Sequence, residues 1–172
     1  PTAKLHVTPD TSIGLYQALL AYEIDISIMV KPAISIPKSL RYWVLRNEPL
    51  MLIHHHSIDG SIEQILATQP YIQYDPLCWG GQLAKQYLQD KNINKQSIFD
   101  LDSLEAITQL VSESVGVSLI PDWIGLKAKQ LNITAKPICN PKYQRELILI
   151  SAYHPKLPKL VDIFLQQAKS AI

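Results

Sequence analysis

Apolar and polar positions alternate in blocks along this chain, and the clearest block lies at residues 100–123. Asp102 is placed to cap a helix, and Glu105 three residues later completes a capping box. A stripe of apolar residues follows at helical spacing, and Gly116 stands where a left-handed C-terminal cap is expected. A short apolar strand then ends at Pro121, which has no backbone N–H to offer a sheet. This block predicts one helix–strand unit of an α/β protein.

The same alternation of short strands and amphipathic helices extends over the rest of the chain. β-branched runs and helical stripes, bounded by Pro, Gly and capping residues, predict the individual elements. We expect strands at residues 5–8, 24–30, 40–46, 50–54, 71–74, 97–101, 117–120, 133–138 and 146–152, and, besides the capped helix, helices at 13–20, 81–90, 123–131 and 157–168. The first two strands and the helix between them are expected to form a βαβ unit, because strands and helices alternate.

Composition excludes several classes of function. The 16 Lys and Arg residues balance 15 Asp and Glu residues to a net charge of +1, and no basic cluster follows a predicted helix, so direct nucleic-acid binding by this segment is not expected. The two cysteines are too far apart for a metal or redox motif, which fits a reducing cytosol. No apolar run has membrane-spanning length, and no secretory signal pattern is present. Common motifs of hydrolases, phosphate-binding loops and metalloproteases are missing, so we expect neither catalysis nor a cofactor or metal.

Three segments resemble the effector-binding domain of LysR-type bacterial transcriptional regulators. They are DSLEAI…LV…GVSLIPDW at residues 102–123, ALLAYEIDISIMV at residues 18–30 and NEPLMLIH at residues 47–54. The resemblance implies a periplasmic-binding-protein type II-like α/β fold, with two Rossmann-like lobes joined by two crossing strands. The expected lobes are residues 1–52 plus 149–172, and residues 53–148. It also implies that the DNA-binding domain and the first strand and helix of lobe one lie outside this sequence.

The resemblance also implies a function. Such a domain senses a small effector metabolite, expected here to be anionic, in the cleft between the lobes, and DNA is contacted through the N-terminal domain. We expect a cytoplasmic homodimer or homotetramer without membrane contact, in which strand 5–8 packs against residues 83–88 and 97–101 of the partner. A periplasmic solute-binding protein for transport is the alternative, and an enzyme on the same scaffold is a third possibility.

The loop at residues 74–81 is the first candidate for the effector site, because it joins a strand to a helix and contains aromatic residues and glycines. By position, the resemblance places Tyr74, Asp75, Cys78 and Trp79 at the cleft. Alternatively, Trp79 caps the core of its lobe, and Cys78 is an inert thiol or, as in one branch of the family, a redox sensor.

Further candidates lie on the opposite wall of the expected cleft. Lys31 follows a predicted strand and is placed to pair with an anionic effector, or else it is a plain surface lysine. Thr11 and Ser12 are placed to offer hydroxyl groups to the same ligand, or else simply to cap a helix. The three histidines at residues 54–56 are expected in an exposed loop rather than at a metal ion, because adjacent residues of a strand point to opposite faces.

Overall fold

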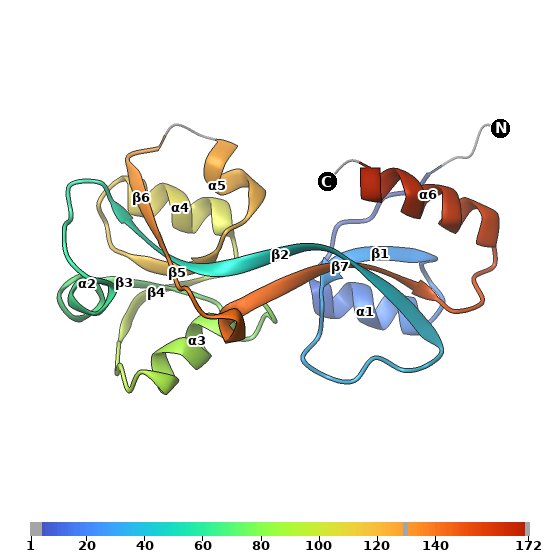
Figure 1. The fold of residues 1–172 in the computed structure, drawn as a ribbon, viewed down its shortest axis with the longest axis horizontal. Helices are drawn as coiled ribbons and strands as arrows, with labels where there is room; N and C mark the ends of the chain where they lie inside the picture. The colour runs from blue at the N-terminus through green and yellow to red at the C-terminus, as the bar shows by residue number, and fades with distance from the viewer. Residues whose placement is uncertain (1–4, 129–130, 171–172) are drawn as a thin grey trace.

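A computed structural model describes residues 5–128 and 131–170 of the protein, and the statements below refer to these residues. It has two lobes that lie side by side and are joined by two long strands (Figure 1). These strands are β2 (Leu40–His55) and β7 (Gln144–Ala152). The two-lobed α/β fold with two crossing strands, expected from the resemblance, is confirmed.

Helices and strands alternate along most of the chain. The helices are α1 (Ser12–Leu20), α2 (Ile62–Thr68), α3 (Gly81–Asp90), α4 (Leu104–Ser112), α5 (Ile124–Ala128) and α6 (Pro158–Ser170), with one 3-10 turn, η1 (Pro141–Tyr143). The shorter strands are β1 (Ile26–Val30), β3 (Tyr71–Tyr74), β4 (Ser97–Leu101), β5 (Ser118–Pro121) and β6 (Ile133–Pro137).

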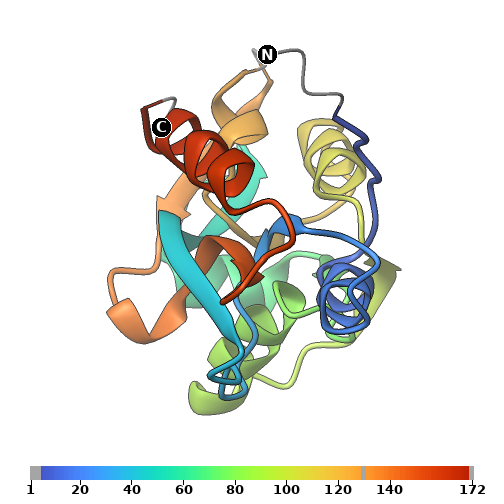
Figure 2. The same cartoon turned by 90° about the vertical axis from the view of Figure 1, so that its right-hand side faces the viewer.

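Lobe one is built on an antiparallel sheet of three strands. Strand β7 lies in the middle and pairs with β1 on one side and with the first half of β2 on the other. Helices α1 and α6 lie on opposite sides of this sheet (Figures 1 and 2). The core under α1 contains Tyr16, Leu19, Met29, Leu40, Ile148 and Ile150. Because successive side chains of a strand point to opposite faces of the sheet, β7 contributes side chains to the face covered by α1 and to the face covered by α6.

Lobe two begins where β2 changes its neighbours. As far as Pro49, β2 pairs with β7, and from Leu50 onwards it lies between β5 and β6. A second, parallel pair of strands, β3 and β4, is linked to this sheet through the bridge of Tyr71 to Val117. Helices α2, α3 and α4 pack around these strands, with cores that contain Leu52, Ile65, Tyr71, Leu88 and Val117 in one layer and Ile53, Ile72, Ile107, Val111 and Ile120 in the other.

The predicted strand at residues 5–8 is wrong. These residues form no strand, and the side chains of Leu5 and Val7 are 71% and 83% exposed. The βαβ unit expected there is therefore also wrong, and β1 runs antiparallel to its neighbour β7. Two alternating apolar residues form a strand only where a sheet edge is present to pair with them.

Two further differences concern β2 and α2. The predicted strands at 40–46 and 50–54 form one continuous strand, in which an irregularity between Val44 and Arg46 absorbs the change in register. Helix α2 was not predicted, although its signal is present in the sequence. Ser61 and Gln64 form a capping box, in which each side chain accepts a hydrogen bond from the other residue's backbone N–H.

The ends of α4 also differ from the prediction. Ser103, not Asp102, caps this helix and accepts a hydrogen bond from the Ala106 N–H at 3.2 Å. The left-handed residue after the helix is Ser114 with φ 61°, not Gly116. Gly116 is needed for a different reason, because a Cβ there would lie 2.8 Å from the Pro70 carbonyl oxygen. The helix predicted at 123–131 is the short α5, and residues 129–130 lie outside the described residues.

Candidate functional site

A cleft of about 610 Å³ lies between the two lobes. Its walls come from both lobes and from the beginning of the crossing strand β7. Lobe one contributes the segment 30–35, lobe two contributes Trp79 and the inner face of α3, and η1 and β7 close one side; the residues are Val30, Lys31, Pro32, Ala33, Ile34, Ser35, Trp79, Gln82, Leu83, Gln86, Pro141, Gln144, Arg145 and Glu146. A cleft of this size suits a small metabolite, and walls from two lobes make its shape depend on how the lobes are oriented.

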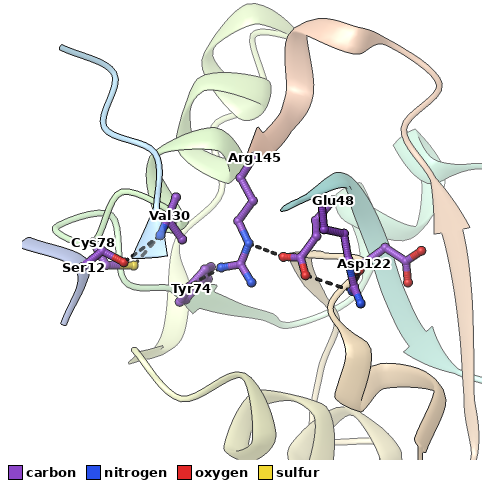
Figure 3. Close-up of polar contacts among 9 residues, drawn as sticks. Ser12, Val30, Glu48, Tyr74, Cys78, Asp122 and Arg145 are labelled. Carbon is purple, nitrogen blue, oxygen red and sulfur yellow. Dashed lines mark hydrogen bonds and ion pairs between the residues drawn. The ribbon is translucent and has the colours of Figure 1, made fainter. Parts of the chain in front are cut away.

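A buried group of charges on the crossing strands lies beside this cleft. Glu48 of β2 accepts a hydrogen bond from Arg145 Nε at 2.5 Å and pairs with Arg46 at 2.9 Å. The side chains of Glu48 and Arg145 are only 4% and 9% exposed, whereas that of Arg46 is 28% exposed. One carboxylate therefore holds two guanidinium groups (Figure 3). Charged hydrogen bonds of this kind fix the direction of each guanidinium.

Arg46 also ties the group to lobe two. Its Nη2 atom donates a hydrogen bond of 2.7 Å to the carbonyl oxygen of Asp122, in the loop that follows β5. The backbone N–H of Asp122 donates in turn to the Pro49 carbonyl at 2.8 Å. The position of this loop is thus set by the strand β2 at the point where β2 passes from one lobe to the other.

Lys31 is placed at the cleft, as predicted, but its charge is already paired. Its Nζ atom forms an ion pair with Glu146 and lies 5.0 Å from the centroid of the Tyr42 ring. The hydrogen bond to Glu146 raises the pKa of Lys31 above its ordinary value of 10.5. The backbone N–H of Lys31 donates to the Glu146 carbonyl as well, at 2.8 Å. Lys31 and Glu146 therefore form one wall of the cleft as a neutral pair.

The loop at residues 74–81 is held mainly by contacts with itself. The Asp75 carboxylate accepts from the Leu77 N–H at 2.8 Å, and the Cys78 thiol donates to the Asp75 carbonyl at 2.9 Å. The same sulfur accepts from the Gly81 N–H at 3.3 Å. These contacts occupy Asp75 and Cys78 in shaping the turn that leads into α3.

Tyr74 connects this loop to the charged group. Its side chain is buried, and its hydroxyl accepts a long hydrogen bond of 3.5 Å from Arg145 Nη1. Burial raises the pKa of Tyr74, so the phenol stays neutral at physiological pH. Figure 3 shows Arg145 reaching from β7 to a position between Tyr74 and Glu48.

Trp79 bridges the two lobes. It belongs to the loop of lobe two, yet it packs against the core of lobe one, where its ring meets Tyr16 edge to face at 5.7 Å. Gly80 and Gly81, which follow Trp79, are closely surrounded by atoms of other residues. A Cβ at Gly80 would lie 2.9 Å from Arg145 Nη1, and one at Gly81 would lie 1.9 Å from the Asp75 carbonyl oxygen. Glycine at both positions lets the start of α3 approach the charged group.

The structure brings together some of the predicted site residues. Lys31 and Trp79 line the cleft, and Tyr74 contacts Arg145 behind it. Thr11 caps α1 by accepting from the Gly14 N–H at 3.1 Å, and Ser12 Oγ accepts from the Val30 N–H at 3.1 Å. Both hydroxyl groups thus act within the framework of lobe one. Effector binding by the seven predicted residues stays a prediction.

Sequence reasoning missed Arg145 and the three glutamines of the cleft, Gln82, Gln86 and Gln144. The adjacent Arg145 and Glu146 at the start of the return strand were a weak signal for a charged site. The sequence offered no means of pairing Arg145 with Glu48, which is 97 positions away.

The histidine segment differs from its prediction. His54 lies within β2 and is buried, so the expected exposed loop is wrong at this position. The rings of His55 and His56 lie against each other with centroids 4.3 Å apart. In the part of the chain that the structure describes, no group of three or more His, Cys, Asp or Glu side chains is arranged to hold a metal ion. Within the same residues, no helix combines the length and the apolar character needed to cross a bilayer.

The geometry defines a ligand-binding domain of two lobes with a cleft between them, and comparison with known proteins specifies the family. The family model "LysR substrate binding domain" matches residues 1–172. No curated protein matches the sequence. Two solved structures with a similar fold are described as the Synechocystis PCC6803 CcmR regulatory domain in complex with 2-PG and the effector-binding domain of QuiR in complex with shikimate.

These structures are similar in fold but distant in sequence. The CcmR domain is 16% identical with a TM-score of 0.77, over 94% of this chain and 79% of that chain. The QuiR domain is 17% identical with a TM-score of 0.74, over 94% and 78%. A regulator domain from Rhodococcus sp. RHA1 is 17% identical with a TM-score of 0.73, over 92% and 80%.

The chain belongs to the LysR substrate-binding domain family. It is a ligand-sensing regulatory domain of the LysR type, and the cleft between its lobes is the candidate site for its ligand. The family is a regulatory one and not a family of enzymes. The resemblance of the three sequence segments is thereby confirmed.

Proposed function

We propose that this domain senses a small anionic metabolite that binds beside Arg145 in the cleft between the lobes. The observation that carries the proposal is the position of Arg145 in the wall of the cleft, with its Nε atom held by Glu48. A guanidinium that is held in place loses little orientational entropy when an anion binds, and burial strengthens the interaction. The distant structures that contain 2-PG and shikimate are compatible with such a ligand.

Binding would be read out as a shift between interlobe arrangements. Because the cleft has walls from both lobes, a ligand that contacts both walls favours the arrangement in which those contacts are best. The crossing strands and the contact of Trp79 with Tyr16 are the links through which one lobe is oriented on the other. We propose that one lobe is residues 1–52 plus 149–172 and that the other is residues 53–148. We also propose that the hydroxyl groups of Thr11 and Ser12 contact the effector from the lobe-one side.

The change would be passed to a DNA-binding domain of the same regulator. We propose a cytoplasmic protein that acts as a homodimer or homotetramer, contacts DNA through that domain rather than through this segment, and catalyses no reaction. The net charge of +1 supports the proposal that this segment does not itself contact DNA, because a DNA-binding face needs an excess of Lys and Arg. The remaining points rest on the family.

The dimer surface on lobe two is proposed to include β4. Ile98 and Phe99 on this strand are 49% and 48% exposed, and β4 pairs with β3 alone among the described strands. Sedimentation velocity at micromolar concentration tests this. We expect Ile98→Asp to yield monomers, because a charge would have to be buried, whereas the control Ile124→Asp on α5, at a position 74% exposed, leaves the assembly intact. A wild-type protein that sediments as a monomer contradicts the proposal.

The sensing role is tested by thermal shift with a library of metabolites. A ligand at a hundred times its Kd stabilises the native state by about 2.7 kcal/mol, which raises Tm by roughly 5–10 °C in a chain of this size. We expect hits among anions and not among their neutral amides, and we expect Arg145→Gln to abolish them. Arg41→Gln is the matched control, because Arg41 also pairs with a carboxylate, that of Asp162, but lies outside the cleft. Hits that survive Arg145→Gln would contradict the proposal.

A further inference from the structure

The positive charges of the cleft differ in how fully they are compensated. Lys31 and Arg145 both line it. Lys31 has a carboxylate to itself, since Glu146 pairs with it. Arg145 shares Glu48 with Arg46, so the single negative charge of Glu48 is divided between two guanidinium groups. The cleft therefore presents one cation whose charge is incompletely balanced.

Arg145 also has unused hydrogen-bonding capacity. Its Nε atom is taken by Glu48, and its Nη1 atom makes the long 3.5 Å contact with Tyr74. Among the described residues, nothing accepts a hydrogen bond from Nη2. Nη1 faces the buried Tyr74 and Gly80, so Nη2 is the nitrogen of the guanidinium from which a carboxylate oxygen of a ligand could accept a charged hydrogen bond.

A second negative charge on the ligand would find no partner in the same place. Glu146 lies in the wall of the cleft and Glu48 lies behind Arg145, so a dianion would bring like charges together. Desolvating an unpaired charge costs several kilocalories per mole, which the contacts of a small ligand do not offset. The balance of charge favours a ligand with a charge of −1.

The remaining walls are mostly apolar, with a few amides. Val30, Pro32, Ala33 and Ile34 come from lobe one, and Trp79 and Leu83 come from lobe two. Tyr16 holds the Trp79 ring edge to face, so the indole is a rigid wall rather than an adaptable one. The side-chain amides of Gln82 and Gln144 bond to none of the described residues, and each offers a donor and an acceptor to a polar substituent.

We infer that the effector is a monocarboxylate with a flat, largely apolar body, whose carboxylate accepts a hydrogen bond from Arg145 Nη2 while its body lies between Trp79 and the segment 32–34. This inference rests on the proposed function and specifies its ligand class. Gln82 and Gln144 would then distinguish ligands by a hydroxyl or carbonyl group on the body.

Isothermal titration of the whole chain with a small set of probes tests the inference. The probes are benzoate and 4-hydroxybenzoate, their neutral counterpart benzamide, the dianion phthalate, the small anion acetate, and inorganic phosphate. We expect the two benzoates to bind roughly tenfold to a hundredfold more tightly than each of the other probes, the range that one charged hydrogen-bonded contact supplies. Arg145→Gln should remove this preference, and Arg41→Gln should leave it unchanged.

The outcomes separate the ligand class from the sensing role. If phthalate or phosphate binds more tightly than benzoate and Arg145→Gln abolishes that binding, the monocarboxylate class is overturned while an anion sensor at Arg145 stands. If benzamide binds as tightly as benzoate, or if Arg145→Gln leaves benzoate binding unchanged, both proposals are overturned. Circular dichroism of Arg145→Gln verifies that the variant is folded, and retained binding of Arg145→Lys supports a role of the charge itself.

Discussion

Replacing Glu48 with glutamine tests whether the crossing strands depend on the buried group of charges. The carboxylate is 4% exposed and holds two arginines, at 2.5 Å and 2.9 Å. The substitution keeps the shape of the side chain but removes its charge, which leaves Arg145, 9% exposed, without a counterion. Removing one partner of a buried ion pair costs about 3–5 kcal/mol. Because Arg46 is 28% exposed and can turn towards water, we expect the lower end, about 3 kcal/mol.

Urea denaturation followed by circular dichroism measures this change in the free energy of unfolding. The loss is a large part of the roughly 5–15 kcal/mol that stabilises a typical domain. In thermal unfolding it corresponds to a drop in Tm of about 6–12 °C. Asp162→Asn is the control, because its ion pair with Arg41 is largely exposed and should contribute no more than about 1 kcal/mol.

A double-mutant cycle identifies the source of the loss. In the Glu48→Gln background, Arg145→Gln should cost much less than in the wild type, because it removes a guanidinium that has already lost its partner. A loss from Glu48→Gln that equals that of Asp162→Asn would refute the reasoning, and so would additive effects of the two substitutions.

Two further substitutions are expected to have defined effects. Gly81→Ala should destabilise the protein by about 1–3 kcal/mol in urea denaturation, because the new Cβ would lie 1.9 Å from the Asp75 carbonyl oxygen, whereas Gly14→Ala, which meets only the movable side chain of Asp10, should cost nothing. If Gly81→Ala and Gly14→Ala changed the free energy of unfolding equally, the turn before α3 would adapt freely to a Cβ and the reasoning would be wrong. Hydrogen bonds from neighbouring side chains, that of Lys142 first, lower the pKa of Asp90 from 3.8 to about 2. The advantage of the wild type over Asp90→Asn should therefore be complete above pH 3.8 and vanish as the pH falls through about 2, as measured by denaturation over this range. A difference that does not change with pH would contradict this assignment.

Much of the fold could be predicted from the sequence because its signals are local. Periodicity, caps and prolines within a few residues indicate the strands β3 to β6 and the helices α3, α4 and α6. The missed helix α2 carried such a signal too, in its capping box. At residues 5–8 the local signal is misleading, since alternation predicts a strand whether or not a neighbouring strand exists to pair with it.

The sequence by itself determined the family and most of the helices and strands of lobe two, because these depend on short segments, and the resemblance of those segments implied the two crossings. Tertiary structure decided the site. Arg145 is 97 positions from Glu48 and 71 from Tyr74, and only the pairing of β2 with β7 and the packing of the loop 74–81 bring them together. It also decided that Lys31 is paired with Glu146 and that Thr11 and Ser12 bond within lobe one. Which polar groups remain available to a ligand depends on the contacts that the rest of the chain has already used, and those contacts exist only in the folded protein.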